Sequence, residues 1–365
     1  RNNMKIALIT DTHFGARNDS EVFNNYFFKF YDNVFFPYLK EHNIKHCIHL
    51  GDITDRRKFI NFKTLDKFRH DFVYKLGRYD VDTHVIIGNH DTYYKNTNEI
   101  NSMNTLFTSF DGKYEPYIYT KAKEVDFDGC KMLFLPWICD DNRDETMQMI
   151  KDTDAQVVMG HLEVKGFTMY KGFTNFDHGL DRQIFDKFDC VYTGHFHHKS
   201  TQGNITYLGN PYQITWSDYG DKRGFHIFDT ETREIEFIEN PYSIFAKLNY
   251  DDREKNYEDF DVSEYKDKHV KVVVLNKINN VQFDKLIDKL YAVGVAELTI
   301  IEDFTDFDAT FVDDKNLKLD DTLSLLHTYV DEVDTTADKT RIKDDMKRLY
   351  VEASNHLTNL LEKLK

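Results

Sequence analysis

Five short motifs rich in aspartate, asparagine and histidine follow one another between residues 11 and 197. They are Asp11-Thr12-His13, Gly51-Asp52-Ile53-Thr54-Asp55, Gly88-Asn89-His90-Asp91, Gly160-His161 and Gly194-His195-Phe196-His197. Their ligand atoms are nitrogen and oxygen, which suits borderline or hard divalent ions, and the lack of thiolates argues against a structural zinc site. One carboxylate that bridges two such ions about 3.5–4 Å apart builds a two-metal site for phosphoryl chemistry.

Each motif alone is a weak signal, because Asp-x-His pairs and Gly-Asp turns are common on protein surfaces. All five motifs, however, stand directly after a run of residues that predicts a β-strand. Packing gives no reason to place polar residues at every one of these strand ends. Ligands of α/β proteins bind beyond the carboxyl ends of the strands, so we expect the five motifs to converge on one site.

The strands that end at the motifs alternate with segments of helical periodicity. Strands are expected at residues 4–10, 45–50, 83–87, 155–159 and 189–193. Apolar residues at helical spacing predict helices over residues 22–34, 62–76 and 100–110. Asp128-Gly129 between two apolar runs predicts a β-hairpin. This alternation predicts an α/β fold, a layered sandwich with mixed sheets.

The pattern changes near residue 241, where a second part of the chain begins. Residues 269–301 predict a strand, a helix and a strand, which is a small βαβ unit. Residues 302–340 contain twelve acidic and three basic residues, and an amphipathic helical pattern continues to residue 364. We therefore expect a main domain over residues 4–240, a small cap domain over 241–303, and an acidic linker with a helix-loop-helix over 304–365.

Composition excludes several classes of protein. With 365 residues, of which 41% are hydrophobic and 15% aromatic, the chain can form a sizeable core, so global disorder is excluded. The net charge of −16 argues against a non-specific nucleic-acid coat. It does not exclude a nucleic-acid enzyme, because local charge and bound ions set the field at a site. No run approaches the roughly 20 apolar residues of a membrane helix, and the four cysteines form no CxxC pair, which indicates a reducing compartment.

The order of the five motifs resembles that of the calcineurin-like metallophosphoesterases. Within that superfamily the chain is similar to the SbcD-type nucleases of DNA double-strand-break repair, among them the recombination endonuclease subunits of T-even phages. Leu135-Pro136-Trp137 and Gly209-Asn210-Pro211 also fit this resemblance. It implies a calcineurin-like fold with a βαβ cap and a C-terminal helical pair. It also implies DNA exonuclease and endonuclease activity in the cytoplasm, which is the host cytoplasm if the chain comes from a phage.

The resemblance further implies two divalent ions, typically Mn²⁺, with Mg²⁺ as the alternative. Asp52 would bridge them. The first ion would be bound by Asp11, His13 and His197, and the second by Asn89, His161 and His195.

His90 matches a histidine that does not bind metal in the family. The resemblance implies that it faces the scissile phosphate and protonates the leaving oxygen or stabilises the charge that develops there. Asp55 matches a position that orients this histidine in related phosphatases. His49, inside the second strand, is expected to face the core, and the alternative is that it orients a ligand.

Arg56, Arg57 and Lys58 follow Asp55 directly, in a stretch (residues 53–75) with seven basic and three acidic residues. One interpretation is a solvated helix face, and the other is contact with the DNA backbone beside the metal ions. The apolar stripes of the helices over residues 62–76 and 100–110 are expected in the core, although the family uses helices in these places to form a homodimer.

The chain has no GxxxxGK[ST] loop, so it is not itself a P-loop ATPase. The resemblance implies a partner instead, an SbcC-type coiled-coil, SMC-like ATPase bound by the C-terminal helices. The alternative is a helical hairpin that folds back on its own domain. Two other functions stay open: a phosphoprotein or cyclic-nucleotide phosphoesterase of the same superfamily, and a non-catalytic scaffold on the same fold.

Overall fold

Two six-stranded mixed sheets form the larger part of the computed structural model, which describes residues 4–107, 115–170, 173–174, 179–302 and 341. The first sheet has the order β14-β13-β1-β2-β3-β4, and β1, β2, β3 and β4 run parallel. Its strands are β1 (Lys5–Ile9), β2 (His46–His49), β3 (Asp82–Ile86), β4 (Tyr117–Tyr119), β13 (Gly224–Asp229) and β14 (Ile235–Glu239).

The second sheet has the order β11-β12-β10-β7-β6-β5, with its four middle strands parallel and both edge strands antiparallel. Its strands are β5 (Lys123–Phe127), β6 (Cys130–Leu135), β7 (Val157–His161), β10 (Cys190–Gly194), β11 (Ser200–Gln202) and β12 (Ile205–Tyr207). Asp128 and Gly129, with φ of 52° and 92°, form the predicted turn between β5 and β6. Two short strands, β8 (Thr168–Tyr170) and β9 (Phe173–Thr174), pair beside this sheet.

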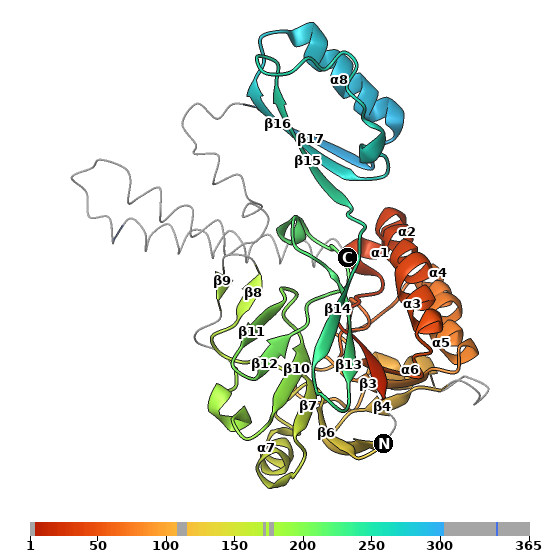
Figure 1. Cartoon of the computed structure of the whole chain (residues 1–365), viewed down its shortest axis with the longest axis vertical. Coiled ribbons are helices and arrows are strands. Elements are labelled where there is room, and N and C mark those ends of the chain that lie inside the picture. The colour runs from red at the N-terminus through yellow and green to blue at the C-terminus, as the bar shows by residue number, and fades with distance from the viewer. Residues whose placement is uncertain (1–3, 108–114, 171–172, 175–178, 303–340, 342–365) are drawn as a thin grey trace. The chain divides into compact units, whose positions relative to one another are not determined.

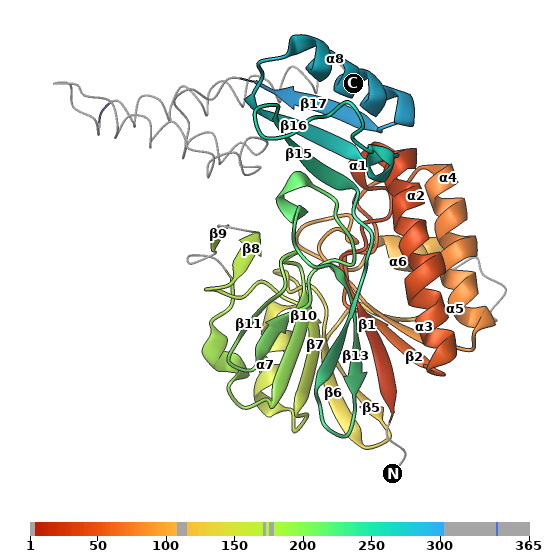
Figure 2. The same ribbon diagram turned by 45° about the horizontal axis from the view of Figure 1, so that its top comes forward.

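Helices cover the outer face of each sheet, as Figures 1 and 2 show. The first sheet is covered by α2 (Glu21–Phe30), α3 (Phe36–Glu41), α4 (Phe62–Lys67) and α5 (Tyr74–Arg78). Two π-helical segments, Tyr31–Phe35 and Phe68–Val73, connect α2 with α3 and α4 with α5. The second sheet is covered by α7 (Arg143–Asp152) and a 3₁₀ turn, Arg182–Phe185. Short helices α1 (Ala16–Asp19) and α6 (Ser102–Phe107) complete this part.

The alternation of side chains along each strand explains the four layers. Ala7 and Ile9 of β1 face the helices, whereas Ile6 and Leu8 face the second sheet, and all four are fully or almost fully buried. Phe134 of β6 lies in the core between the two sheets. The predicted α/β layered sandwich with mixed sheets is therefore confirmed. None of the described helices is long and apolar enough to cross a membrane.

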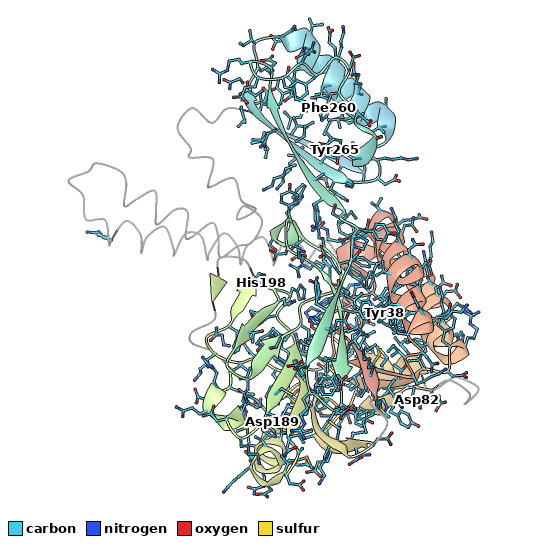
Figure 3. The ribbon with its side chains drawn as sticks, in the orientation of Figure 1. Tyr38, Asp82, Asp189, His198, Phe260 and Tyr265 are labelled. Carbon is cyan, nitrogen blue, oxygen red and sulfur yellow. The ribbon has the colours of Figure 1, made fainter. Side chains whose placement is uncertain are left out.

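A small α/β layer follows the two sheets along the chain. It contains β15 (Phe245–Asp251), β16 (His269–Asn276), α8 (Asn280–Val293) and β17 (Glu297–Ile301) in an all-parallel sheet. Its core includes the ring of Tyr265, which lies 6.4 Å from that of Phe260 (Figure 3). The predicted strand-helix-strand unit is confirmed, and β15 is an additional strand that the sequence did not predict.

The domain boundaries at residues 240 and 303 stay predictions. By its internal contacts the chain divides into residues 1–301 and residues 302–365. The predicted acidic linker and C-terminal helical pair lie outside the described residues, apart from Arg341.

The core between the sheets generates a stability prediction. Phe134→Ala removes a ring that is 0% exposed, so we expect the free energy of unfolding in urea to fall by about 3–5 kcal/mol. Phe59→Ala, at a side chain that is 65% exposed, serves as the control and should change this free energy by less than about 0.5 kcal/mol. Equal losses in the two variants would contradict this account of the core.

Candidate metal centre

The carboxyl ends of β1, β2, β3, β7 and β10 bring the five predicted motifs together. Backbone hydrogen bonds join the first two motif loops: the N–H of Asp11 donates to the carbonyl of Gly51 at 3.0 Å, and the N–H of His13 donates to that of Asp52 at 3.1 Å. The second sheet contributes the last residues of β7 and β10, which pair in register at Gly194 and His161. The predicted convergence is thus present in the structure.

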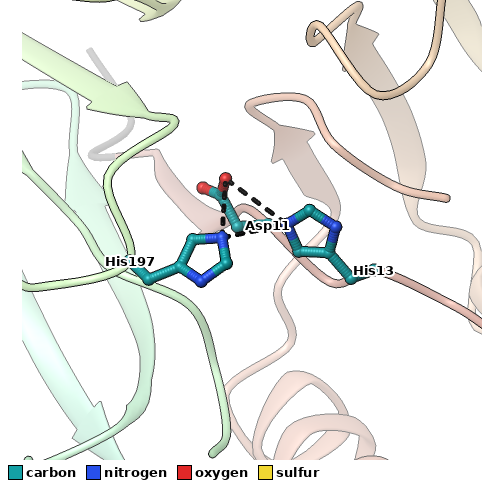
Figure 4. Close-up of side chains that lie close together, drawn as sticks. All are labelled: Asp11, His13 and His197. Atoms are coloured by element: carbon teal, nitrogen blue, oxygen red, sulfur yellow. Dashed lines mark hydrogen bonds and ion pairs between the residues drawn. The ribbon is translucent and has the colours of Figure 1, made fainter. Parts of the chain in front are cut away.

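Asp11, His13 and His197 form a first cluster, shown in Figure 4. Their ligand atoms lie within 4.8 Å of one another. The Nε2 atoms of His13 and His197 are 3.0 Å apart, and Oδ1 of Asp11 lies 3.9 Å and 3.8 Å from them. Neighbouring ligand atoms of an octahedral ion with bonds of about 2.1 Å also stand about 3.0 Å apart, so the spacing of the two histidine nitrogens fits a bound divalent ion, and Asp11 lies somewhat farther from them.

Asn89, His161 and His195 form a second cluster. Oδ1 of Asn89 lies 3.0 Å from Nε2 of His161 and 3.0 Å from Nδ1 of His195. The carbonyl of Leu50 lies 2.7 Å from Nδ1 of His161. A carbonyl only accepts, so Nδ1 carries the proton and Nε2 is directed at the cluster.

The carboxylate of Asp52 lies between the two clusters. Its Oδ1 atom is 3.4 Å from Nε2 of His161, and its Oδ2 atom is 3.9 Å from Nε2 of His13. The residue is 2% exposed. Each cluster therefore has one oxygen of the same carboxylate beside it, which is the arrangement that a bridging ligand requires.

The electrostatics of the clusters also suit cations. Burial lowers the pKa of His13 and of His195 to about 3, and it lowers the pKa of His197 well below its usual range, so these imidazoles are neutral and able to bind metal. Burial raises the pKa of Asp11 to about 7, and the charge of Asp52 adds to this rise. A cation at this place would lower the pKa of Asp11 again.

Four of the seven predicted ligands have a backbone that L-residues rarely adopt: Asp11, His13, Asp52 and His195 have φ of 53°, 43°, 53° and 91°. Such conformations cost energy and persist where the surrounding structure holds them. Glycine is required beside them for space: a Cβ at Gly194 would stand 2.0 Å from Oγ1 of Thr10, and one at Gly88 would stand 2.3 Å from the backbone nitrogen of Asp52.

His90 lies beside the first cluster, with its ring centroid 4.9 Å from that of His13. Its Nδ1 atom donates to the backbone carbonyl of Asp55 at 2.6 Å, and its backbone N–H donates to Oδ1 of Asp52 at 2.7 Å. The carboxylate of Asp55 instead lies 3.6 Å from Nδ1 of His13. The hydrogen bond that His90 donates to Asp55 therefore ends on the main chain, a contact that no side-chain pattern in the sequence could reveal.

Asp91 has a structural position that the sequence alone did not assign. Its fully buried carboxylate accepts four backbone N–H groups, from Asp52, Ile53, Thr54 and Gly88, at 2.8–3.2 Å. Burial, together with the charge of Asp52, raises the pKa of Asp91 to about 6. The carboxylate ties the loop after β2 to the loop after β3, so it positions Asp52 without touching the clusters' centre.

Two further buried groups hold the motif loops. His49 accepts the N–H of Gly51 and lies 2.9 Å from the hydroxyl of Thr12. Its contacts are therefore with the loops that carry the predicted ligands, which favours the alternative that it orients them. Arg223, which is 5% exposed, donates to the carbonyl of His197 and to Oδ1 of Asn210. His198, labelled in Figure 3, points elsewhere, with Nδ1 2.9 Å from Asp221.

The three predicted substrate-binding residues lie on the loop after β2. Arg56 pairs with Asp19 and lies over the ring of Phe59, 4.5 Å from its centroid. Arg57 is half-buried, and Lys58 is exposed with its Nζ 5.4 Å from the ring of Tyr93. Arg56 therefore carries a partly neutralised charge, whereas Lys58 presents its charge to solvent.

The chain is similar to several known proteins. Residues 4–199 match the family model described as Calcineurin-like phosphoesterase. The chain is 30% identical over 358 residues to Exonuclease subunit 1 of Enterobacteria phage T4, an alignment that covers 96% of this chain and 100% of that protein. Similar solved structures include an archaeal phosphodiesterase, with 16% identity, a TM-score of 0.32 and coverage of 65% of this chain and 100% of that one. Another is a dimetal phosphatase from Danio rerio, with 11% identity, a TM-score of 0.38 and coverage of 61% and 91%.

The position of Asp91 generates a prediction. Asp91→Asn places an amide NH₂ against backbone N–H donors, so we expect the free energy of unfolding to fall by about 1–3 kcal/mol. We also expect the affinity for Mn²⁺ to fall about 10- to 100-fold, because the loop that carries Asp52 is no longer held. Denaturation and calorimetry measure the two effects. The exposed Asp259→Asn is the control, and an unchanged Mn²⁺ affinity in Asp91→Asn would contradict the positioning role.

The pKa shifts predict how metal binding depends on pH. Burial alone would lower the pKa of His161, but the adjacent Asp52 carboxylate raises it to about 9. Below pH 9 a cation must therefore displace a proton from His161, and near pH 7 also from Asp11. We expect the Mn²⁺ affinity to rise at least about tenfold per unit between pH 6 and pH 8. Calorimetry in two buffers of different ionisation enthalpy would show the released proton, and an affinity independent of pH would contradict the assignment.

Proposed function

The chain belongs to the calcineurin-like phosphoesterase family, and from this premise we propose that it is a metal-dependent DNA exonuclease and endonuclease subunit of a recombination and double-strand-break repair complex. The observation that carries the proposal is the position of Asp52, with one carboxylate oxygen beside each of the two clusters. The relative from phage T4 is described as an exonuclease subunit and aligns along its whole length, which supports both the nuclease activity and a complex.

In this proposal Asp11, His13 and His197 would hold the first ion, Asn89, His161 and His195 would hold the second, and Asp52 would bind both. When bound, two divalent ions, Mn²⁺ or Mg²⁺, neutralise phosphate oxygens and activate a water for attack on phosphorus. The side chains of the two clusters supply nitrogen and oxygen atoms at the spacing that such ions need.

His90 is the proposed acid or charge stabiliser. Its Nδ1–H is engaged by the carbonyl of Asp55, so Nε2 is the atom that remains for the substrate. The hydrogen bond fixes the ring 4.9 Å from His13, at the edge of the first cluster. A proton held on Nε2 there would pass to the leaving oxygen of the cleaved phosphodiester.

The proposed DNA contacts lie on the loop after β2, where Arg56, Arg57 and Lys58 follow Asp52 by four to six residues. Apolar side chains nearby support a homodimer: Phe62 is 87% exposed and Ile100 is 52% exposed, although the sequence placed both on core stripes. We further propose that the C-terminal helices bind an SbcC-type ATPase and that the complex acts in the host cytoplasm. Both rest on the family resemblance, and the helices lie outside the described residues.

Cleavage of labelled linear duplex DNA tests the proposal directly. We expect Mn²⁺-dependent shortening of the DNA by the wild-type chain and loss of this activity on chelation. Asp52→Asn should abolish it, because an amide has one uncharged oxygen and cannot place a charged oxygen beside each ion. Phosphoprotein and cyclic-nucleotide substrates are assayed in parallel to separate this function from that of the other phosphoesterases. If one of these substrates were hydrolysed rapidly while the DNA stayed intact, the proposal would be overturned.

A second variant separates catalysis from metal binding. His90→Gln should keep two bound ions, as measured by calorimetry, and should lose about 10²–10⁴-fold in cleavage rate because the acid or charge stabiliser is gone. The exposed His42→Gln is the matched control and should behave as wild type. A lower metal stoichiometry in His90→Gln would instead show that His90 is a ligand.

A further inference from the structure

A pocket of about 120 Å³ opens beside the second cluster, with His161 in its wall. Trp137, Arg143 and Glu163 also line it, together with the apolar side chains of Ile138, Leu162 and Leu180. Sites that enclose a whole drug-sized ligand have volumes of roughly 300–1,000 Å³. The volume of this pocket is smaller and suits a single ring system, such as one nucleobase. Neither the metal ligands nor His90 explain the presence of this pocket.

Trp137 is held rigidly in the wall of this pocket. Its backbone N–H donates to the carbonyl of Ile87 at 2.8 Å, directly before the loop that carries Asn89. Its carbonyl accepts the side-chain amides of Asn98 and Asn142 at 2.8 Å and 3.0 Å. Both asparagines are buried. These three hydrogen bonds hold the backbone of Trp137, from which the half-buried indole extends.

The indole of Trp137 adjoins the second cluster. Its ring centroid lies 5.0 Å from that of His195 and 6.1 Å from that of His161. A phosphate held at this cluster is joined to a nucleobase by one sugar. A base bound on the indole therefore belongs to the nucleotide whose phosphate is at the cluster, or to its neighbour.

The chemistry of the pocket wall suits a nucleobase. An indole face stacks on any base, and such stacking contributes binding without reading sequence. Arg143 offers N–H donors to ring nitrogens and carbonyl oxygens of a base, and Glu163 offers an acceptor to an exocyclic amino group. A mostly apolar site with a few polar groups of this kind is the usual composition of a small-molecule pocket.

We propose that this pocket binds the nucleobase of the terminal nucleotide of the DNA strand, with Trp137 as its stacking surface. The inference rests on the proposed nuclease function and adds the recognition of an unpaired end. Because a base inside a duplex is covered by its neighbours, the pocket requires a frayed or single-stranded terminus.

Binding is tested without catalysis through fluorescence. The chain has two tryptophans, so Trp216→Phe leaves Trp137 as the only one. In this variant we expect dAMP to quench the emission, with an affinity about 10- to 100-fold higher than that of 2-deoxyribose 5-phosphate, which has no base. Equal affinity for the two probes would overturn the proposal, and it would leave the nuclease function standing if DNA cleavage persists.

Cleavage supplies the second test. Wild-type enzyme should cleave a single-stranded oligonucleotide with a normal terminal nucleotide about 10- to 100-fold faster, in kcat/KM, than one with an abasic terminal nucleotide. Trp137→Ala should remove this difference by slowing only the normal substrate, and Trp137→Phe should keep most of it because a phenyl ring still stacks. Equal slowing of both substrates in Trp137→Ala would show that the indole supports only the cluster. Failure of the wild-type enzyme to cut either DNA would refute the nuclease function instead.

Discussion

The carboxylate of Asp52 is buried between two groups of histidines, and the strand-end loops of both sheets meet around it. Burial alone would raise its pKa, but His161 and the other nearby imidazoles hold that pKa well below its usual range, so the group stays charged. Its backbone is in the left-handed region, with φ of 53°. A charged, strained residue in this place persists because the carboxylate of Asp91 binds three consecutive N–H groups of its loop and a fourth from the neighbouring loop.

The two sheets position the residues around Asp52. The first three motifs follow the carboxyl ends of β1, β2 and β3 in the first sheet. The last two lie at the carboxyl ends of β7 and β10 in the facing sheet. The apolar interior between them sets the separation of the two sheets. Glycines at the loop bends let the backbones approach so closely that a Cβ at Gly194 would overlap Thr10. Packing in the core therefore fixes distances of about 3 Å between ligand atoms that are up to 184 residues apart.

Much of this could be predicted from the sequence, because polar motifs at strand ends and apolar runs between them are local signals. The five motif positions, the layered sheets and the β16-α8-β17 unit are of this kind. The structural role of Asp91 was not predicted, because nothing in the local sequence shows that four backbone N–H groups surround its carboxylate. The contact of Asp55 with His90 runs through a carbonyl, which every residue has. Strand β15 was missed although Ala246, Leu248 and Tyr250 alternate with polar residues, which is the local pattern of a half-buried strand, so the sequence did offer this signal.

The net charge of −16 is compatible with the proposed DNA substrate, because residues 53–75, directly after the bridging aspartate, carry a net charge of +4. We propose that the chain holds two ions around Asp52. Anomalous diffraction from Mn²⁺-soaked crystals tests it most directly. The account predicts two peaks about 3.5–4 Å apart, one beside His13 and His197 and one beside His161 and His195, with a carboxylate oxygen of Asp52 on each. A single peak, or a second ion with no contact to Asp52, would contradict it.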